Sequence, residues 1–203
     1  SWPAAAGLDV SRETIAKFES FAALVGKWNG SINLVSKSTL PDLWERHIVD
    51  SAQIMGSAPP FHHWVDFGSG GGFPGIVVAI LSESRSQDTK ITMIESDHRK
   101  SVFLRTAIRE LGLPASVISK RIDFVEQQGA DVVSARALAD LNTLLGFAKR
   151  HMSPTGTALF PKGSRWREEH SAAQANWVYQ CEAIQSMTNS DAAILKIKDI
   201  SRV

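Results

Sequence analysis

The spacing of hydrophobic positions changes near residue 60, and this change divides the chain into two parts. Before that point, apolar residues recur every three or four positions, which is the spacing of amphipathic helices. The first helix is expected from Ser11, which is placed to cap it, to Trp28, and the second from Pro41 to Met55. The pattern predicts a helical cap over residues 1–60, followed by a second domain over residues 61–203.

After residue 60, short apolar runs alternate with helix-like stretches. Such alternation is typical of α/β proteins with a largely parallel sheet. The expected strands are 64–67, 90–95, 115–119, 131–134, 157–160, 178–187 and 192–198. The expected helices are 74–84, 97–111, 138–152 and 166–175, with a turn at 153–156. The last two strands are joined by four residues, too few for a crossover helix, so they must form an antiparallel hairpin. The pattern predicts seven strands with the last one reversed.

A glycine-rich stretch follows the first of these strands directly. Residues 66–75 read Asp-Phe-Gly-Ser-Gly-Gly-Gly-Phe-Pro-Gly, with five glycines in eight positions. Glycine allows positive φ and a close approach of the backbone to a ligand. The helix that comes next offers free N–H groups at its N-terminus. A strand, a glycine turn and a helix in this order predict a nucleotide-binding site.

The positions within this stretch distinguish between nucleotide classes. A dinucleotide fingerprint counted from Gly68 requires a glycine at position 73, where Phe73 stands. A later register, starting at Gly70, does match and leaves a nicotinamide-dependent oxidoreductase as an alternative. An acidic residue before G-x-G, here Asp66, resembles the first motif of class I S-adenosylmethionine-dependent methyltransferases. No phosphate-binding G-x-x-x-x-G-K-[ST] motif is present.

Polar residues follow the ends of the other predicted strands, where ligands bind in open α/β sheets. Glu95 ends the second strand and is placed to bind both ribose hydroxyls, or else to flank the next helix as an N-terminal charge. Asp123 follows the third strand, near the expected adenine, or caps a short helix. Arg136 follows the fourth strand, where it contacts a cofactor carboxylate or an RNA phosphate, or forms a structural ion pair. Lys162 follows the fifth strand at the same edge.

Composition limits the class of protein. The chain has 203 residues, 43% hydrophobic and 21% charged, as in ordinary globular proteins. The single cysteine, Cys181, excludes an intrachain disulfide, is expected in the core, and fits a reducing, cytosolic compartment. Neither a membrane-length apolar run nor the order of a signal peptide is found. The histidines lack metal-ligand spacing, so no metal is expected.

The charge balance restricts how nucleic acid could bind. The net charge is +1 and the pI is about 7.9, below the value of roughly 9 that is typical of nucleic-acid-binding domains. A nucleic-acid face must therefore be a local patch. The candidate phosphate contacts are Arg46, Arg99, Lys100, Lys120, Arg121, Arg136, Lys149, Arg150, Lys162, Arg165 and Arg167.

Several segments in combination resemble one family, the ribosomal RNA small-subunit methyltransferase G family, also called glucose-inhibited division protein B. The glycine stretch alone is typical only of the superfamily, whereas the Arg-His-Ile-x-Asp-Ser helix makes the resemblance specific. The segments are 27–29, 33–36, 46–51, 65–76, 99–105, 134–137 and 162–163. These segments occur between residues 27 and 163 in the same order as in the family. The last forty residues show little resemblance.

The resemblance implies N7-methylation of one guanine in 16S ribosomal RNA by a cytoplasmic, monomeric enzyme. The methyl donor would be S-adenosyl-L-methionine, and the product S-adenosyl-L-homocysteine. The RNA is expected within the small ribosomal subunit or an assembly intermediate. The expected cofactor contacts are Asp66, Gly68, Ser69, Gly70, Gly72, Phe73, Glu95, Ile122, Asp123 and Arg136. The expected substrate-positioning residues are Arg46, His47, Asp50, Arg136 and Lys162.

The motifs that are missing agree with this chemistry. Guanine N7 has an in-plane lone pair and no proton, so it can attack the sulfonium methyl without a general base. The [DN]-P-P-[YFW] motif of amino-group methyltransferases is absent after the fourth strand, and no cysteine is placed for attack on cytosine C5. Catalysis would then depend on alignment and exclusion of water. The alternatives are a class I methyltransferase acting on another RNA or a small molecule, and an RNA-binding assembly factor without activity.

Overall fold

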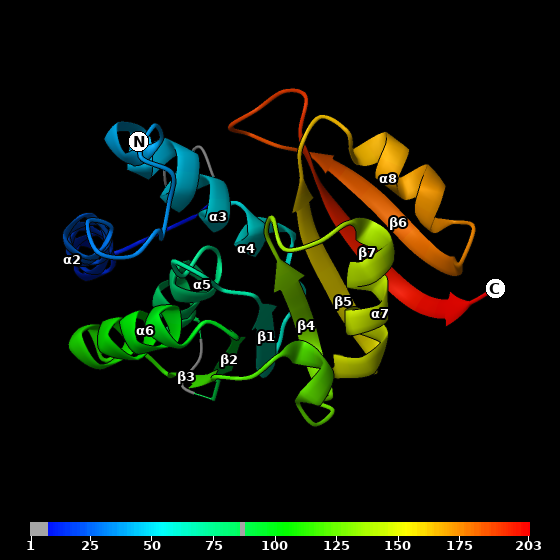
Figure 1. Cartoon of the computed structure of the whole chain (residues 1–203), viewed down its shortest axis with the longest axis horizontal. Helices are drawn as coiled ribbons and strands as arrows, with labels where there is room; N and C mark the ends of the chain where they lie inside the picture. The colour runs from blue at the N-terminus through cyan, green and yellow to red at the C-terminus, as the bar shows by residue number, and fades with distance from the viewer. Residues whose placement is uncertain (1–7, 86–87) are drawn as a thin grey trace.

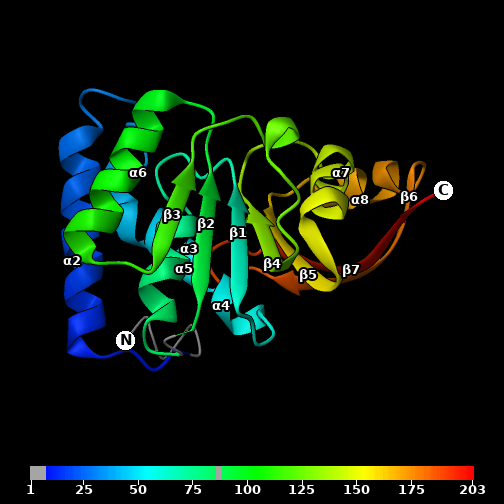
Figure 2. The same ribbon diagram turned by 90° about the horizontal axis from the view of Figure 1, so that it is seen from below.

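A seven-stranded sheet forms the centre of the protein (Figure 1). The computed structural model describes residues 8–85 and 88–203, so the first seven residues of the expected cap lie outside the described residues. The strands are β1 (His63–Phe67), β2 (Lys90–Ile94), β3 (Ala115–Ile118), β4 (Ala130–Ala135), β5 (Met152–Lys162), β6 (Trp177–Gln185) and β7 (Ala193–Arg202). Their order in the sheet is β3-β2-β1-β4-β5-β7-β6 (Figure 2).

The strand directions confirm the predicted topology. Strands β1 to β5 pair in parallel, whereas β7 is antiparallel to both β5 and β6. The last two strands therefore form the predicted hairpin, with the last strand reversed. The carboxyl ends of five parallel strands meet at one edge, which is where a ligand site is expected.

Helices cover both faces of the sheet (Figures 1 and 2). One core cluster joins the sheet to α2 (Arg12–Trp28), α5 (Gly75–Ser82) and α6 (His98–Leu111). A second cluster joins the other face to α7 (Leu141–His151) and α8 (Trp166–Ala173). Both faces are covered, so the inner strands are apolar on both sides, which explains their continuous hydrophobic runs.

The helix ends follow from local chemistry. The Ser11 hydroxyl accepts a hydrogen bond from the Thr14 N–H, as predicted for the cap of α2. Asp97 caps α6 in the same way, and Gly112 ends it in the left-handed region at φ +63°. Both boundaries were readable from the sequence, because the capping residues directly precede the apolar period.

The N-terminal helix packs on the glycine-rich segment. The ring of Phe21 on α2 lies 5.2 Å from that of Phe73 and 6.5 Å from that of Phe103 on α6. These residues are buried in the same cluster as α5. The helical segment thus shares its core with the sheet, and its separation as a distinct cap ending at residue 60 stays a prediction.

The second predicted helix, from Pro41 to Met55, is wrong as one regular α-helix. The segment consists of η1 (Leu40–Asp42, 3₁₀), η2 (Trp44–Val49, a π-helix), α3 (Asp50–Ala52) and α4 (Ile54–Ser57). The Asp50 N–H donates to the carbonyls of Glu45 and His47, and the first of these bonds has the five-residue step of a π-turn. Over only six residues, this wider turn leaves almost the same apolar spacing, so periodicity did not reveal it.

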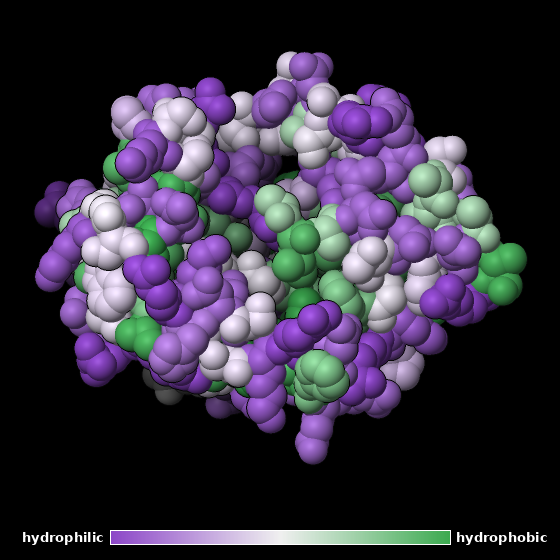
Figure 3. All heavy atoms as spheres, viewed as in Figure 1, coloured by the Kyte–Doolittle hydropathy of each residue, from purple (hydrophilic) through white to green (hydrophobic). Residues whose placement is uncertain are grey.

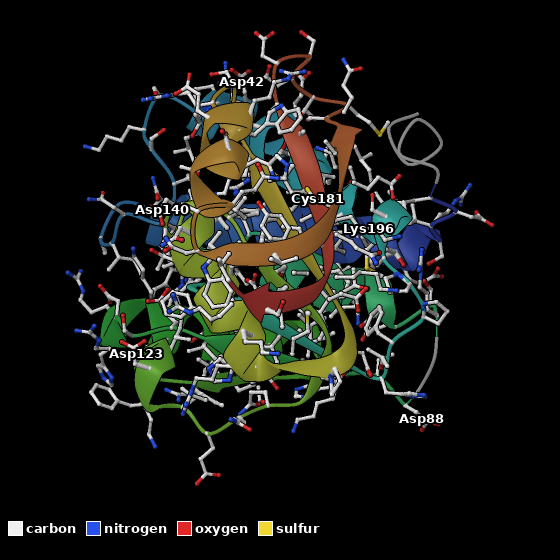
Figure 4. The ribbon with its side chains drawn as sticks, turned by 90° about the vertical axis from the view of Figure 1, so that its right-hand side faces the viewer. Asp42, Asp88, Asp123, Asp140, Cys181 and Lys196 are labelled. Carbon is white, nitrogen blue, oxygen red and sulfur yellow. The ribbon has the colours of Figure 1, made fainter. Side chains whose placement is uncertain are left out.

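The predicted turn at residues 153–156 is also wrong, since these residues lie within β5. Ala130 pairs with Met152, but Val132 pairs with Thr157, so the extra residues bulge out of the ladder. Cys181, on β6, is partly buried against the second cluster, where burial raises the pKa of its thiol (Figure 4). Within the described ranges, no helix has the length and apolar character to cross a membrane.

Candidate cofactor and substrate site

The glycine loop turns sharply between β1 and α5. Gly68, Gly70 and Gly72 have φ values of +61°, +54° and +92°, which other residues rarely adopt. The Gly68 N–H donates to the carbonyl of Ile94 at 2.8 Å, so the loop stays close to the end of β2. The glycines are therefore required by the backbone geometry at this strand end.

The buried side chain of Asp66 fixes the glycine loop by hydrogen bonds. Its carboxylate is fully buried and accepts hydrogen bonds from the hydroxyls of Ser69 at 2.7 Å and Ser134 at 2.8 Å, and from the Gly75 N–H at 3.0 Å. The Trp64 indole N–H donates to the Ser134 hydroxyl at 2.8 Å and completes the network. The structure thus gives Asp66 a positioning role, because its hydrogen bonds join the glycine-rich segment to Ser134 on β4. A direct cofactor contact by Asp66 stays a prediction.

We expect the stability contribution of Asp66 to depend on pH. Burial raises the pKa of its carboxyl group to about 6, partly offset by the three hydrogen bonds. The folded chain therefore binds this proton more tightly than the unfolded chain. The contribution of Asp66 is greatest below about pH 4 and is lost as pH rises through about 6, by about 3 kcal/mol. Urea unfolding should show that the free energy of unfolding of wild type falls relative to that of Asp66→Asn between about pH 4 and pH 6. Parallel pH curves for the two proteins would contradict this.

A pocket of about 500 Å³ lies at the carboxyl ends of β1, β2 and β3. The Glu95 carboxylate is fixed there by the N–H groups of Gly70 and Asp97, each at 2.8 Å. These bonds orient Glu95 at the pocket wall, so it both holds the loop and flanks the following helix. The expected contacts that line this pocket are Gly68, Gly70, Glu95, Ile122 and Asp123. The other expected contacts, Asp66, Ser69, Gly72, Phe73 and Arg136, lie outside its lining.

A second pocket, of about 370 Å³, lies between the helical segment, the ends of β4 and β5, and the β6–β7 turn. It adjoins the first, since Ala137 lines both. Ala137 has a φ of +54°, a conformation that residues other than glycine rarely adopt. Figure 3 shows this face hollowed near its centre. Two adjoining pockets at one sheet edge can bring two reactants together.

Arg136 connects the sheet to the helical segment beside the second pocket. Its guanidinium donates to the Asp50 carboxylate at 3.3 Å and lies 5.3 Å from the centre of the Phe73 ring. It also bonds His47 Nδ1 at 2.7 Å. Arg136 therefore forms the structural ion pair that the sequence left open, with Asp50 as its partner. The Arg46 carbonyl accepts from Arg136 at 3.5 Å, while the Arg46 residue lines a neighbouring pocket.

His47 is neutral at pH 7. Burial, and secondly the charge of Arg136, lower its pKa to about 4. The Thr39 hydroxyl donates to the Ser36 carbonyl, so at 2.8 Å it accepts the proton of His47 Nε2. Nδ1 is then the acceptor for the guanidinium. His47 is thus a fixed packing partner that keeps Arg136 in place.

The ammonium group of Lys162 is hydrogen-bonded within the protein. Its ammonium donates to the Ala139 carbonyl at 2.7 Å and to the Glu169 carboxylate at 2.9 Å, and its side chain is only 8% exposed. Glu169 also accepts from the Leu141 N–H at the start of α7. Lys162 therefore anchors the loop between β4 and α7 that separates the two pockets. Its contact with phosphate or guanine stays a prediction.

Replacing Lys162 with methionine should misplace this loop. The change keeps the aliphatic stem but removes both hydrogen bonds to the loop. We expect the methyl transfer that the family resemblance implies to fall at least about tenfold, and the free energy of unfolding to fall by about 2 kcal/mol, within the range for hydrogen bonds to charged groups. Steady-state rates and urea unfolding measure the two effects. Lys198→Met, on the exposed part of β7, is the control, and unchanged activity in Lys162→Met would remove Lys162 from the site.

The β6–β7 turn contributes residues that the sequence did not indicate. The Thr188 hydroxyl donates to Asp50 at 2.6 Å, and the Gln53 amide donates to Asp50 at 3.1 Å and to the Ser186 hydroxyl at 3.1 Å. The Gln53 side-chain oxygen accepts from the Met187 N–H. These bonds close one wall of the second pocket. No motif marks the Gln53–Ser186 and Asp50–Thr188 bonds, because they join segments more than 130 residues apart.

The fold is similar to that of several solved structures. Among solved structures, a SAM-dependent methyltransferase from Aquifex aeolicus is similar, with a TM-score of 0.59, 13% identity, and coverage of 77% of this chain and 92% of that one. An O-methyltransferase from Bacillus cereus in complex with SAH gives 0.57 at 12% identity, covering 88% and 90%. The chain has the α/β fold of the class I S-adenosylmethionine-dependent methyltransferases.

The sequence comparisons identify the family within this class. The model of the family described as rRNA small subunit methyltransferase G matches residues 14–197. A ribosomal RNA small subunit methyltransferase G from Ruegeria sp. (strain TM1040) is 53% identical over 196 residues, covering 97% of this chain and 96% of the relative. One from Ruegeria pomeroyi is 51% identical over 201 residues, covering 99% and 98%. The chain belongs to the ribosomal RNA small subunit methyltransferase G family.

Proposed function

We propose that this protein transfers a methyl group from S-adenosyl-L-methionine to N7 of one guanine in 16S ribosomal RNA. The pocket beside Glu95 and the glycine loop would hold the cofactor, with Glu95 on the ribose and Ile122 and Asp123 at the adenine. The target guanine would enter the second pocket, which adjoins the first at Ala137. No metal enters the proposed reaction.

The observation that carries this proposal is the state of the titratable groups around the second pocket. Asp50 accepts bonds from Arg136, Gln53 and Thr188, and Lys162 is bonded to Glu169 and a carbonyl. These side chains are engaged in holding the pocket walls, which suits a reaction that needs no proton removed. Guanine N7 would form its bond to the methyl carbon with its in-plane lone pair as the carbon–sulfur bond breaks, so the purine ring would become cationic and the thioether S-adenosyl-L-homocysteine would leave.

The protein's contribution would then be alignment. The two pocket walls are fixed by Arg136 on one side and Lys162 on the other, so N7, methyl carbon and sulfur can be held in line while water is excluded. The near-neutral net charge supports weak binding of naked RNA. We therefore propose the small ribosomal subunit or an assembly intermediate as the substrate, and we further propose that the protein acts in the cytoplasm as a monomer.

A methyl-transfer assay tests the substrate. Tritiated S-adenosyl-L-methionine is mixed with the protein and small ribosomal subunits from cells that lack the enzyme, with naked 16S RNA as comparison. The proposal predicts label in 16S RNA, and more of it with the particle than with naked RNA. Label confined to protein or to another RNA would contradict it, and cofactor binding without any transfer would favour an inactive assembly factor.

A further inference from the structure

Phe124 is an exposed aromatic residue beside the cofactor pocket. It ends the 3₁₀ turn η3 (Ile122–Phe124), and 73% of its surface is accessible. Val125, the residue after Phe124, and Ile122, two positions before it, are both buried. Among the large hydrophobic residues that the structure describes as exposed, Phe124 is the one with an aromatic ring.

The turn that carries Phe124 is held rigidly. Arg150 donates from Nε and Nη2 to the Val125 carbonyl, at 3.3 and 2.8 Å. The fully buried imidazole of His151 has its Nε2 atom 3.2 Å from the Ile122 carbonyl, and burial lowers its pKa, which favours the neutral form. The Phe124 N–H donates to the Arg121 carbonyl at 3.0 Å. The backbone is therefore fixed while the ring faces solvent, a preorganised arrangement that reduces the cost of binding.

Two cationic residues shortly precede Phe124 in the sequence. Lys120 and Arg121 precede the turn, are exposed, and line the mouth of the cofactor pocket together with Lys100. Arg121 is paired with Asp123 at 3.4 Å, in a contact that is exposed on both sides. The neighbouring Asp123 projects at the periphery of the molecule in Figure 4. The exposed Lys120, which precedes the accessible ring, suits a polyanion that also carries flat apolar groups.

We propose that Phe124 is a stacking platform for an unpaired base of the substrate RNA, with the Lys120 ammonium contacting the adjacent phosphate. The proposal rests on the proposed function. Unpaired bases stack on aromatic side chains in most single-stranded RNA sites, and lysine or arginine neutralises the backbone. The turn follows a strand at the carboxyl edge of the sheet, on which both pockets also lie. One RNA strand would therefore contact Phe124 while its target guanine occupies the second pocket.

The ring is unlike a cofactor contact. Ile122 and Asp123 line the cofactor pocket, whereas Phe124 does not. Changes at Phe124 should therefore affect RNA and leave the cofactor alone. This separation gives the proposal a clear test.

The test compares Phe124→Ala, Phe124→Leu and Phe124→Trp in methylation of small ribosomal subunits. Base–aromatic stacking is worth about 1–3 kcal/mol, so we expect KM for the subunit to rise about tenfold in Phe124→Ala and nearly as much in Phe124→Leu. Phe124→Trp should stay within about twofold of wild type. The Kd for S-adenosyl-L-methionine, measured by calorimetry, should be unchanged in all three. Val178→Ala, at an exposed position on β6, is the matched control.

A second variant tests the phosphate contact. In Lys120→Ala, the slope of log KM against log salt should fall by about one, whereas Phe124→Ala should keep the slope of wild type. Wild-type KM in Phe124→Ala would overturn the proposal, as would activity of Phe124→Leu equal to that of wild type. Weaker binding of the cofactor by Phe124→Ala would also overturn it, because that result would place the ring over the adenine. A rise in KM seen with small subunits but not with naked RNA would overturn it as well, because it would indicate a protein partner. If the wild-type protein methylates no RNA at all, the proposed function fails instead.

Discussion

Gly68→Asp is expected to abolish cofactor binding. A Cβ at this position would lie 2.6 Å from Leu138 Cδ1, and its φ of +61° already strains any side chain. The new carboxylate would also enter the pocket close to Glu95, where a second negative charge is unfavourable. We expect the Kd for S-adenosyl-L-methionine to rise more than about hundredfold, equivalent to about 3 kcal/mol. Isothermal titration calorimetry measures it directly.

Gly112→Asp is the matched control for this experiment. Gly112 has nearly the same φ, +63°, but a Cβ there would meet no atom within 4 Å. It ends α6, away from the pocket lining. We expect this variant to lose some stability through backbone strain while its cofactor Kd stays within about twofold of wild type. Equal loss of binding in both variants would mean that strain, rather than the pocket, explains the effect.

Arg136→Met is expected to have the second largest effect, on methyl transfer. The change removes the guanidinium that bonds Asp50 and His47 and lies beside Phe73. Asp50 and His47 keep their other bonds but lose the partner that ties them to β4. We expect the rate on small subunits to fall about hundredfold and stability by about 2 kcal/mol, the lower part of the range for truncating one partner of a charge pair. Single-turnover rates and urea unfolding measure these effects.

The titration of His47 tests separately whether the loss of the Arg136–His47 contact causes the fall in rate. The Arg136 charge is one of the groups that lower the pKa of His47 to about 4, so NMR titration of the variant should show a higher pKa. Arg109→Met is the control, because Arg109 is an exposed arginine on α6 that is not a candidate phosphate contact. That change should leave rate, stability and the His47 titration unaltered. An unchanged pKa and rate in Arg136→Met would show that the contact is incidental.

Much of the fold was predictable because its signals are local. Strand β1 and the glycine loop are adjacent in the sequence, and Asp97 and Gly112 stand directly at the ends of α6. The reversed last strand followed from the length of one turn. The π-turn at 44–49 was not predictable, because it changes the residues per turn too little to alter the apolar spacing over six positions.

The site was predictable at its strand ends and less so elsewhere. Gly68, Glu95 and Asp123 line one pocket at the sheet edge, because each follows a parallel strand, and their contact with a cofactor stays a prediction. The burial of Asp66 and the commitment of Lys162 to Ala139 and Glu169 depend on tertiary contacts that no local pattern contains. The bond from Thr188 to Asp50 was missed for the same reason.

The position of the methyl group is the most direct test of the proposed chemistry. N7-methylguanosine is cleaved selectively after alkaline borohydride and aniline, and primer extension locates the break. The proposal predicts one break, at a single guanine of 16S RNA, in subunits treated with wild-type protein and S-adenosyl-L-methionine, and none with Gly68→Asp. Methylated RNA that resists this cleavage would contradict methylation at N7.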